Sequence, residues 1–160
     1  MDAIIQEIRF TLNGHLITML VDTRETLLDA IRDHAGLTGA KKGCDEAACG
    51  ACSMLLNGKS ICSCNMLAVE AAGEEIVTIE GISKENIPSE IQKAFIENDA
   101  FQCGFCTAGQ IISATSLLAS AGRETLTKDQ VREGMSGNVC RCGAYAKILE
   151  AVSQASRGGK

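Results

Sequence analysis

Three cysteines, Cys44, Cys49 and Cys52, follow one another at the spacing C-x4-C-x2-C. This run is typical of plant-type [2Fe–2S] sites, which take a fourth thiolate from a more distant cysteine. Gly43 and Gly50 lie beside the thiols, so main-chain N–H groups can approach the sulfurs closely. Zinc sites favour two close ligand pairs, which fits this triple less well. The spacing predicts an iron–sulfur cluster, with zinc or inert buried thiols as the alternatives.

The fourth ligand of this set is not decided by the residue pattern. Cys62 and Cys64 both follow the run at a suitable distance. They have the same parity along a predicted strand, so the alternation of side chains does not distinguish them. Both therefore remain candidates at this point.

A second set of four thiols combines Cys103 and Cys106 with Cys140 and Cys142. Cys106 directly precedes Thr107, where a helix is expected to begin, and the N–H groups of a helix start favour thiolate. Taken alone, the pattern C-x2-C with C-x-C indicates zinc about as readily as iron–sulfur. The first set favours a second iron–sulfur cluster. Two sets of four leave one of the nine cysteines over.

Length and composition allow one ordinary domain or two small ones. The chain has 160 residues, of which 46% are hydrophobic but only 3% aromatic. The core must therefore be aliphatic. Two domains of about 80 residues each would bury little surface, and bound clusters would help to stabilise each of them. The formal net charge of −5 argues against a nucleic acid as partner.

The chain shows no secretory signal at its N-terminus and no apolar run long enough to cross a membrane. An odd number of cysteines without such a signal indicates a reducing compartment and metal ligation rather than disulfides. We therefore expect a cytoplasmic protein without a membrane span.

Two kinds of pattern divide the chain, and they predict an α+β protein of two domains, residues 1–82 and 83–160. The first part should form a β-grasp domain of the plant-type ferredoxin kind. Its expected elements are a strand over 5–12, a hairpin turn at Asn13–Gly14, a helix from an Asp22–Glu25 capping box to Gly36, a second hairpin over 53–62 and a strand over 76–79.

The second part has helical periodicity and should form a small four-helix bundle. Its expected helices run from Pro88 to about Asn98, from a Thr107–Gln110 capping box to Gly122, from a Thr127–Gln130 capping box past Met135, and over the segment that contains Ile148, Leu149 and Val152.

These motifs, taken together and in order, resemble the small iron–sulfur subunit of the molybdenum hydroxylase (xanthine oxidase) family. The segments that carry the resemblance are Gly43–Cys52 with its three thiols, Ser63–Cys64 followed by Leu67–Ala68, Gln102–Thr107, and Gly137–Cys142. They cover nearly the whole chain. The resemblance implies a ferredoxin-like domain, then a helical bundle, and two [2Fe–2S] clusters.

The resemblance also implies roles for individual residues. The first cluster would take Cys44, Cys49, Cys52 and Cys64, which makes Cys62 the spare thiol. The second would take Cys103, Cys106, Cys140 and Cys142. Gln102 and Cys142 would in addition touch the molybdopterin that a large partner subunit holds.

The same resemblance implies an electron-transfer subunit of a molybdenum-containing oxidoreductase, and we do not expect the chain to bind substrate itself. Electrons would pass from the molybdenum centre through both clusters to FAD on a medium subunit or to another acceptor. Two alternatives remain, a zinc-stapled interaction module and a freely diffusing ferredoxin. Neither needs a partner with molybdenum, and the added bundle disfavours the diffusing carrier.

Two short segments depart from the usual family pattern. Ala108 stands where many members have proline, and Gly143–Ala144 stand where many have Thr-Gly before the tyrosine. Neither change removes a ligand. The second resembles some aldehyde- and isoquinoline-oxidising members.

Overall fold

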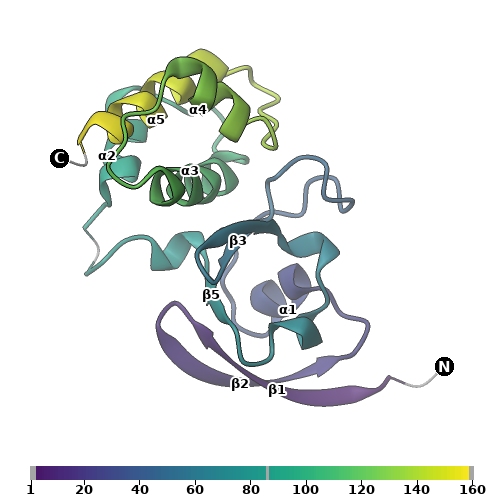
Figure 1. Cartoon of the computed structure of the whole chain (residues 1–160). Helices are drawn as coiled ribbons and strands as arrows, with labels where there is room; N and C mark the ends of the chain where they lie inside the picture. Colours follow the sequence, from purple (N-terminus) through teal and green to yellow (C-terminus); the bar gives the residue numbers. More distant parts are fainter. Residues whose placement is uncertain (1–2, 86, 159–160) are drawn as a thin grey trace.

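In the computed structural model, which describes residues 3–85 and 87–158, a β-grasp unit is followed by a helical unit (Figure 1). The predicted fold class is confirmed. The first unit has a five-stranded mixed sheet in the order β2-β1-β5-β3-β4. Its strands are β1 (Ile5–Leu12), β2 (His15–Asp22), β3 (Ser53–Leu56), β4 (Lys59–Cys62) and β5 (Glu75–Val77).

The β1–β2 hairpin follows the alternation in the sequence. Ile8, Phe10 and Leu12 of β1 are buried, and the residues between them are more exposed. Asn13 and Gly14 both have positive φ, 50° and 83°, as a type I′ turn requires. The parallel pairing of β1 with β5 then brings the later hairpin, β3–β4, into the same sheet.

Helix α1 (Leu27–Asp33) packs its buried face on this sheet, but it does not begin where the sequence pattern placed it. The N-cap is Thr26, whose hydroxyl accepts a hydrogen bond from the Asp29 N–H at 3.2 Å. Asp22 instead binds Arg24, with 2.6 Å between Oδ2 and Nη2. The predicted Asp22–Glu25 capping box is therefore wrong, because a local ion pair takes the carboxylate.

The helical unit has a separate aliphatic core, and its helices surround it. They are α2 (Glu90–Glu97), α3 (Thr107–Ala121), α4 (Lys128–Gly134) and α5 (Tyr145–Gly158). Inward side chains include Phe95, Val131 and Val152, each at most 1% exposed. The Thr127–Gln130 capping box at the start of α4 is confirmed.

Two predicted helix starts need correction. Pro88 lies before α2, and Ser89 is the N-cap, with its N–H donating to Gln92 Oε1 at 2.7 Å. Helix α3 does begin at Thr107, but Gln110 forms no capping box there. The Gln110 side chain is 1% exposed and points into the fold, because a partner from another segment takes its amide.

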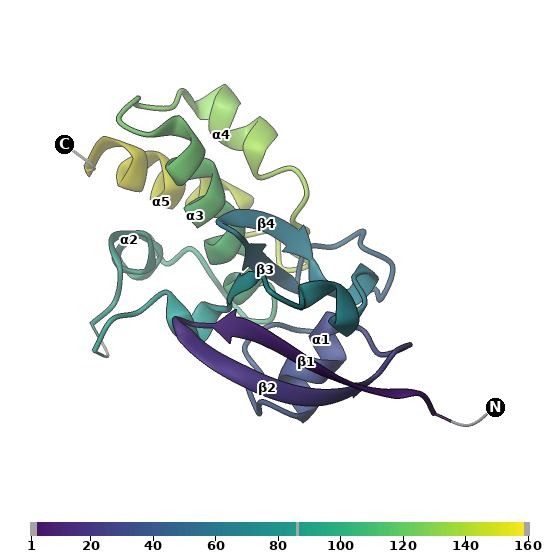
Figure 2. The ribbon, with the colours of Figure 1, turned by 60° about the horizontal axis from the view of Figure 1, so that its bottom comes forward.

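Helix α3 is the element that joins the two units, since it lies against β3 and β4 (Figure 2). The Ser60 N–H of β4 donates to Ser116 Oγ of α3 at 3.0 Å. At the other end of the helix, Gly109 contacts Gly50, and a Cβ on Gly109 would lie 2.1 Å from the Gly50 carbonyl oxygen. Among the described helices, none is both long and apolar enough for a transmembrane segment.

Candidate iron–sulfur sites

The loop between α1 and β3 carries three thiols on a backbone that folds back on itself. Asp45, Ala47 and Gly50 all have positive φ, at 62°, 59° and 70°. Left-handed residues set among right-handed ones turn successive N–H groups to one side, which creates a concave surface for anions. The Ala48 N–H donates to Cys44 Sγ at 3.3 Å, and the Ala47 N–H donates to Cys64 Sγ at 3.4 Å.

The thiols of this first set approach one another in pairs. Cys44 contacts Cys49, and Cys52 contacts Cys64. The main-chain N–H of Glu46, with a smaller contribution from Cys49, lowers the pKa of Cys44 to about 7. In residues 3–85 and 87–158 no three Cys, His, Asp or Glu side chains form a site for a single metal ion. Paired thiols fit a two-iron cluster, in which each iron takes two.

Cys64 and Cys62 differ in their hydrogen bonds although both lie near Cys52. The Cys64 sulfur accepts an N–H, as a thiolate ligand does. The Cys62 sulfur lies 3.7 Å from the Ala47 carbonyl oxygen, to which a thiol can donate a weak hydrogen bond. Burial raises the pKa of Cys64 to about 11, so this thiol would ionise mainly when a metal replaces its proton.

The second set lies where two helices begin. Cys103 and Cys106 precede α3, and Cys140 and Cys142 precede α5, as expected. The thiols again form two pairs, Cys103 with Cys142 and Cys106 with Cys140. The Ala144 N–H donates to Cys140 Sγ at 3.4 Å. The structure thus brings the thiols of each predicted set close to one another in pairs.

The two pairs of the second set differ in exposure. Cys103 and Cys142 are exposed, whereas Cys140 is buried and Cys106 partly so. The Phe105 N–H lowers the pKa of Cys103, and burial raises that of Cys106 to about 11. One pair therefore faces the surface and the other faces the interior of the protein.

Gln102 lies beside the exposed pair. With Cys142 and Lys147 it lines a surface cavity of about 470 Å³. Phe101, which is 44% exposed, adds an apolar wall. The two residues expected to contact a pterin are thus neighbours on one face of the bundle.

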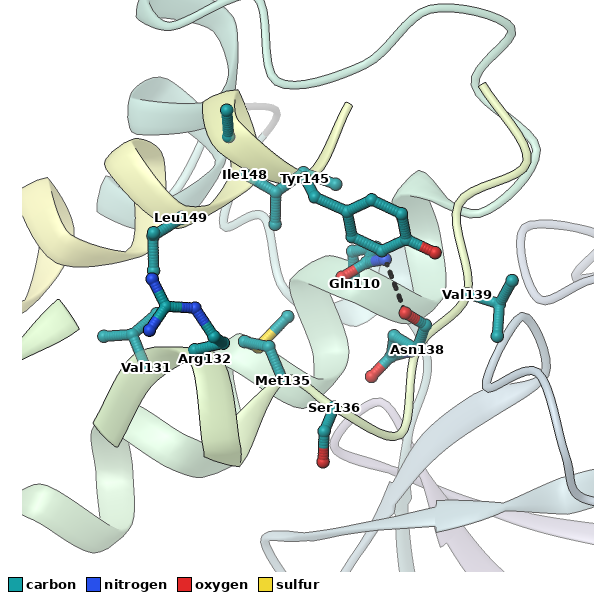
Figure 3. A pocket seen from close by; sticks show the side chains of 11 residues that line it. Gln110, Val131, Arg132, Met135, Ser136, Asn138, Val139, Tyr145, Ile148 and Leu149 are labelled. Carbon is teal, nitrogen blue, oxygen red and sulfur yellow. Dashed lines mark hydrogen bonds between the residues drawn. The ribbon is translucent and has the colours of Figure 1, made fainter. Parts of the chain in front are cut away.

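Three residues at the contact between the units are absent from the predicted site. Asn138 is 6% exposed, and its Nδ2 donates to the Gly50 carbonyl oxygen at 3.1 Å. Gln110 Nε2 donates to the Asn138 carbonyl oxygen at 3.4 Å, as Figure 3 shows beside a largely apolar cavity of about 530 Å³. Gly109 completes the contact. The only signal in the sequence is that all three residues lie within four positions of a predicted ligand, Cys106 or Cys140.

Family models cover both parts of the chain. Residues 10–77 match the 2Fe-2S iron-sulfur cluster binding domain, and residues 78–153 match the [2Fe-2S] binding domain.

Similar proteins match over nearly the whole length of this chain. The aldehyde oxidoreductase iron-sulfur-binding subunit of Escherichia coli (strain K12) is 45% identical over 95% of this chain and 72% of its own. The nicotine 6-hydroxylase small subunit of Paenarthrobacter nicotinovorans is 46% identical over 93% and 88%. The structure of quinoline 2-oxidoreductase from Pseudomonas putida 86 has a TM-score of 0.92 at 40% identity, covering 97% of this chain and 96% of that one.

The fold, the paired thiols and these matches define an iron–sulfur protein with two [2Fe–2S] clusters. The chain belongs to the small iron–sulfur subunits of the molybdenum hydroxylase (xanthine oxidase) family. It is therefore an electron-transfer subunit of a multi-subunit oxidoreductase, which confirms the leading expectation over the zinc module and the diffusing carrier.

Proposed function

We propose that this subunit carries electrons from a large molybdopterin-binding subunit to a flavin-binding medium subunit or another acceptor. The observation that carries the proposal is the pairing of eight thiols in two sets, one open to the surface at Cys103 and Cys142. The ligands would be Cys44, Cys49, Cys52 and Cys64 for the first cluster, and Cys103, Cys106, Cys140 and Cys142 for the second. When bound, each cluster takes up and releases one electron.

The residues of the chain divide the remaining tasks. Gln102 and Cys142 would contact the pterin at the surface cavity, where the amide offers both a donor and an acceptor without added charge. Main-chain N–H groups hold the thiolates. Asp45, Glu46 and Ala48 are exposed beside the first set, so electrons would leave from this loop.

The proposal extends to the boundary of the domains and to the location of the complex. We place the boundary after residue 82, in the segment between the end of β5 at Val77 and the start of α2 at Glu90; Ile79 and Ile82 in this segment pack against the helical core. Nine free cysteines favour the cytoplasm, where thiols stay reduced.

The substrate would be chosen on the large subunit, and the aldehyde- and nicotine-oxidising relatives point to aldehydes and N-heterocycles as the first classes to test.

Metal content and spectroscopy test the cluster assignment. We expect about four irons per chain and two distinct one-electron EPR signals, because two complete thiol sets lie in different surroundings. Iron analysis and an EPR redox titration of the purified complex measure both quantities. A single signal, or zinc as the main metal, would contradict the proposal.

Replacing Gln102 with leucine tests the pterin contact. Both clusters should assemble, but substrate should reduce the bundle cluster more slowly, or molybdenum should be lost from the complex. Dithionite reduction of the subunit should not change. Stopped-flow reduction and molybdenum analysis are the measurements, and Gln6→Leu on the exposed face of β1 is the control. Full molybdenum content with an unchanged rate would make Gln102 merely a surface residue.

A further inference from the structure

The two edge strands of the sheet differ in how they are protected. At one edge, α3 lies against β4, and the Ser60 N–H donates to Ser116 Oγ at 3.0 Å. The other edge is β2, the outermost strand on the opposite side of the sheet (Figure 2). An edge strand with free main-chain groups is a template for pairing with another strand.

The ladder between β1 and β2 shows which main-chain groups of β2 are free. The Thr23 N–H donates to the Ile4 carbonyl oxygen at 2.9 Å, so these two residues form a hydrogen-bonded pair. Such pairs alternate along an antiparallel ladder, and the register here is unbroken, so the odd-numbered residues of β2 bond to β1. The N–H and carbonyl groups of Leu16, Thr18 and Leu20 therefore point away from β1. Within residues 3–85 and 87–158, no hydrogen bond reaches them.

The side chains along this edge are apolar and uncharged. Leu16 is 76% exposed and Leu20 is 61% exposed, on the face of the sheet that turns away from α1. Residues 15–21 contain no Lys, Arg, Asp, Glu or Pro, and lysine and proline are residues with which natural proteins prevent pairing at an edge. In a chain of net charge −5, such a strip is a place where two copies can approach without strong repulsion.

We propose that β2 is a self-association surface, at which β2 of a second copy of this chain pairs antiparallel with it about Thr18. Each Leu16 then lies opposite Leu20 of the other copy on one face of the joined sheet, and Thr18 lies opposite itself. Every free N–H and carbonyl group of these three residues gains a partner. The neighbouring registers with the same faces aligned place Leu16 opposite Asp22 or Leu20 opposite Gly14, which removes the leucine contacts.

This pairing is symmetric, because the same strand contributes to both sides of the contact. It joins the sheets of the two copies into one, and it uses none of the cysteines of the two thiol sets. The inference is therefore independent of the proposed function.

A cysteine at the symmetry axis tests the register. In Thr18→Cys the two new thiols lie on directly opposed residues, whose Cα atoms are about 5.5 Å apart in a hydrogen-bonded pair, within the range for a disulfide. Mild oxidation of the purified complex should therefore link two copies of this subunit on a non-reducing gel. Thr11→Cys on β1 lies one strand further from the contact and should not link them, and neither should the unsubstituted chain.

A lysine at the edge tests the energetics. We expect the iron-loaded full chain to sediment as a dimer in the analytical ultracentrifuge. Leu20→Lys should raise the dissociation constant of the dimer roughly tenfold or more, because the symmetry places the lysine in the contact twice. Ile96→Lys on α2 is the matched control, since Ile96 is 59% exposed and lies outside the sheet. It should leave the dissociation constant unchanged.

Three results would overturn the inference. They are a mass of one chain at every concentration, an unchanged dissociation constant in Leu20→Lys, and no link between copies in Thr18→Cys. A link from Thr18→Cys to a different subunit would also overturn it, because the edge would then take a strand of another protein. Visible absorbance shows whether each variant still holds its clusters. Their absence from the unsubstituted chain would instead count against the proposed function.

Discussion

Replacing Gly109 with alanine should separate the two domains of the subunit where they meet. The new Cβ would lie 2.1 Å from the Gly50 carbonyl oxygen and 3.1 Å from Ala51 Cα, and both are main-chain atoms that cannot rotate away. Such overpacking typically costs about 1–3 kcal/mol. Alanine gains about 1 kcal/mol in helix propensity over glycine, which offsets part of this cost. We expect a lower unfolding temperature for the iron-loaded chain.

Gly137→Ala is the matched control, because a Cβ at that position meets nothing within 4 Å. Thermal unfolding followed by circular dichroism and by the visible absorbance of the clusters measures both variants. A Gly109→Ala protein as stable as the original would show that the domains can shift apart without loss, and that the close approach of α3 to Gly50 is not needed.

The largest effect on cofactor content should come from Cys64→Ser. Its sulfur accepts the Ala47 N–H and contacts Cys52, so its loss should remove the ferredoxin-type cluster while the bundle cluster remains. One EPR signal and about half of the iron should disappear. Cys62→Ser should keep both signals, because the Cys62 sulfur is directed at the Ala47 carbonyl oxygen and not at a main-chain N–H group.

EPR and iron analysis of the two serine variants, made and reconstituted side by side, decide between the cysteines. Retention of both signals in Cys64→Ser with loss of one in Cys62→Ser would reverse the assignment. The pair is well matched, since both residues are near Cys52 and differ by two positions in the chain.

Local patterns in the sequence were enough to predict most of the fold. The first hairpin depends on neighbouring residues only. Its strand shows as the alternation of Ile8, Phe10 and Leu12, and its turn shows as Asn13–Gly14, so the sequence pattern predicts both. The cysteine spacings also indicate their chemistry, because closely spaced runs such as C-x4-C-x2-C are typical of cluster ligands.

Features that depend on tertiary contacts cannot be predicted from local sequence patterns. Gln110 has the spacing of a capping residue, yet a carbonyl from the segment before Cys140 takes its amide. Asp22 has the same kind of spacing, but Arg24 competes for its carboxylate. Asn138 lies 88 positions from Gly50, and no pattern within one segment indicates that they meet.

The spread of the two thiol sets along the chain has a consequence for biogenesis. All four proposed ligands of the first cluster lie within residues 44–64, whereas the second set needs Cys103 and Cys142 with α3 and α4 between them. Since domains emerging from the ribosome can fold in order, the ferredoxin-type site can be complete while the bundle is still being translated. The cluster that electrons would reach last is then the first that the cell can install.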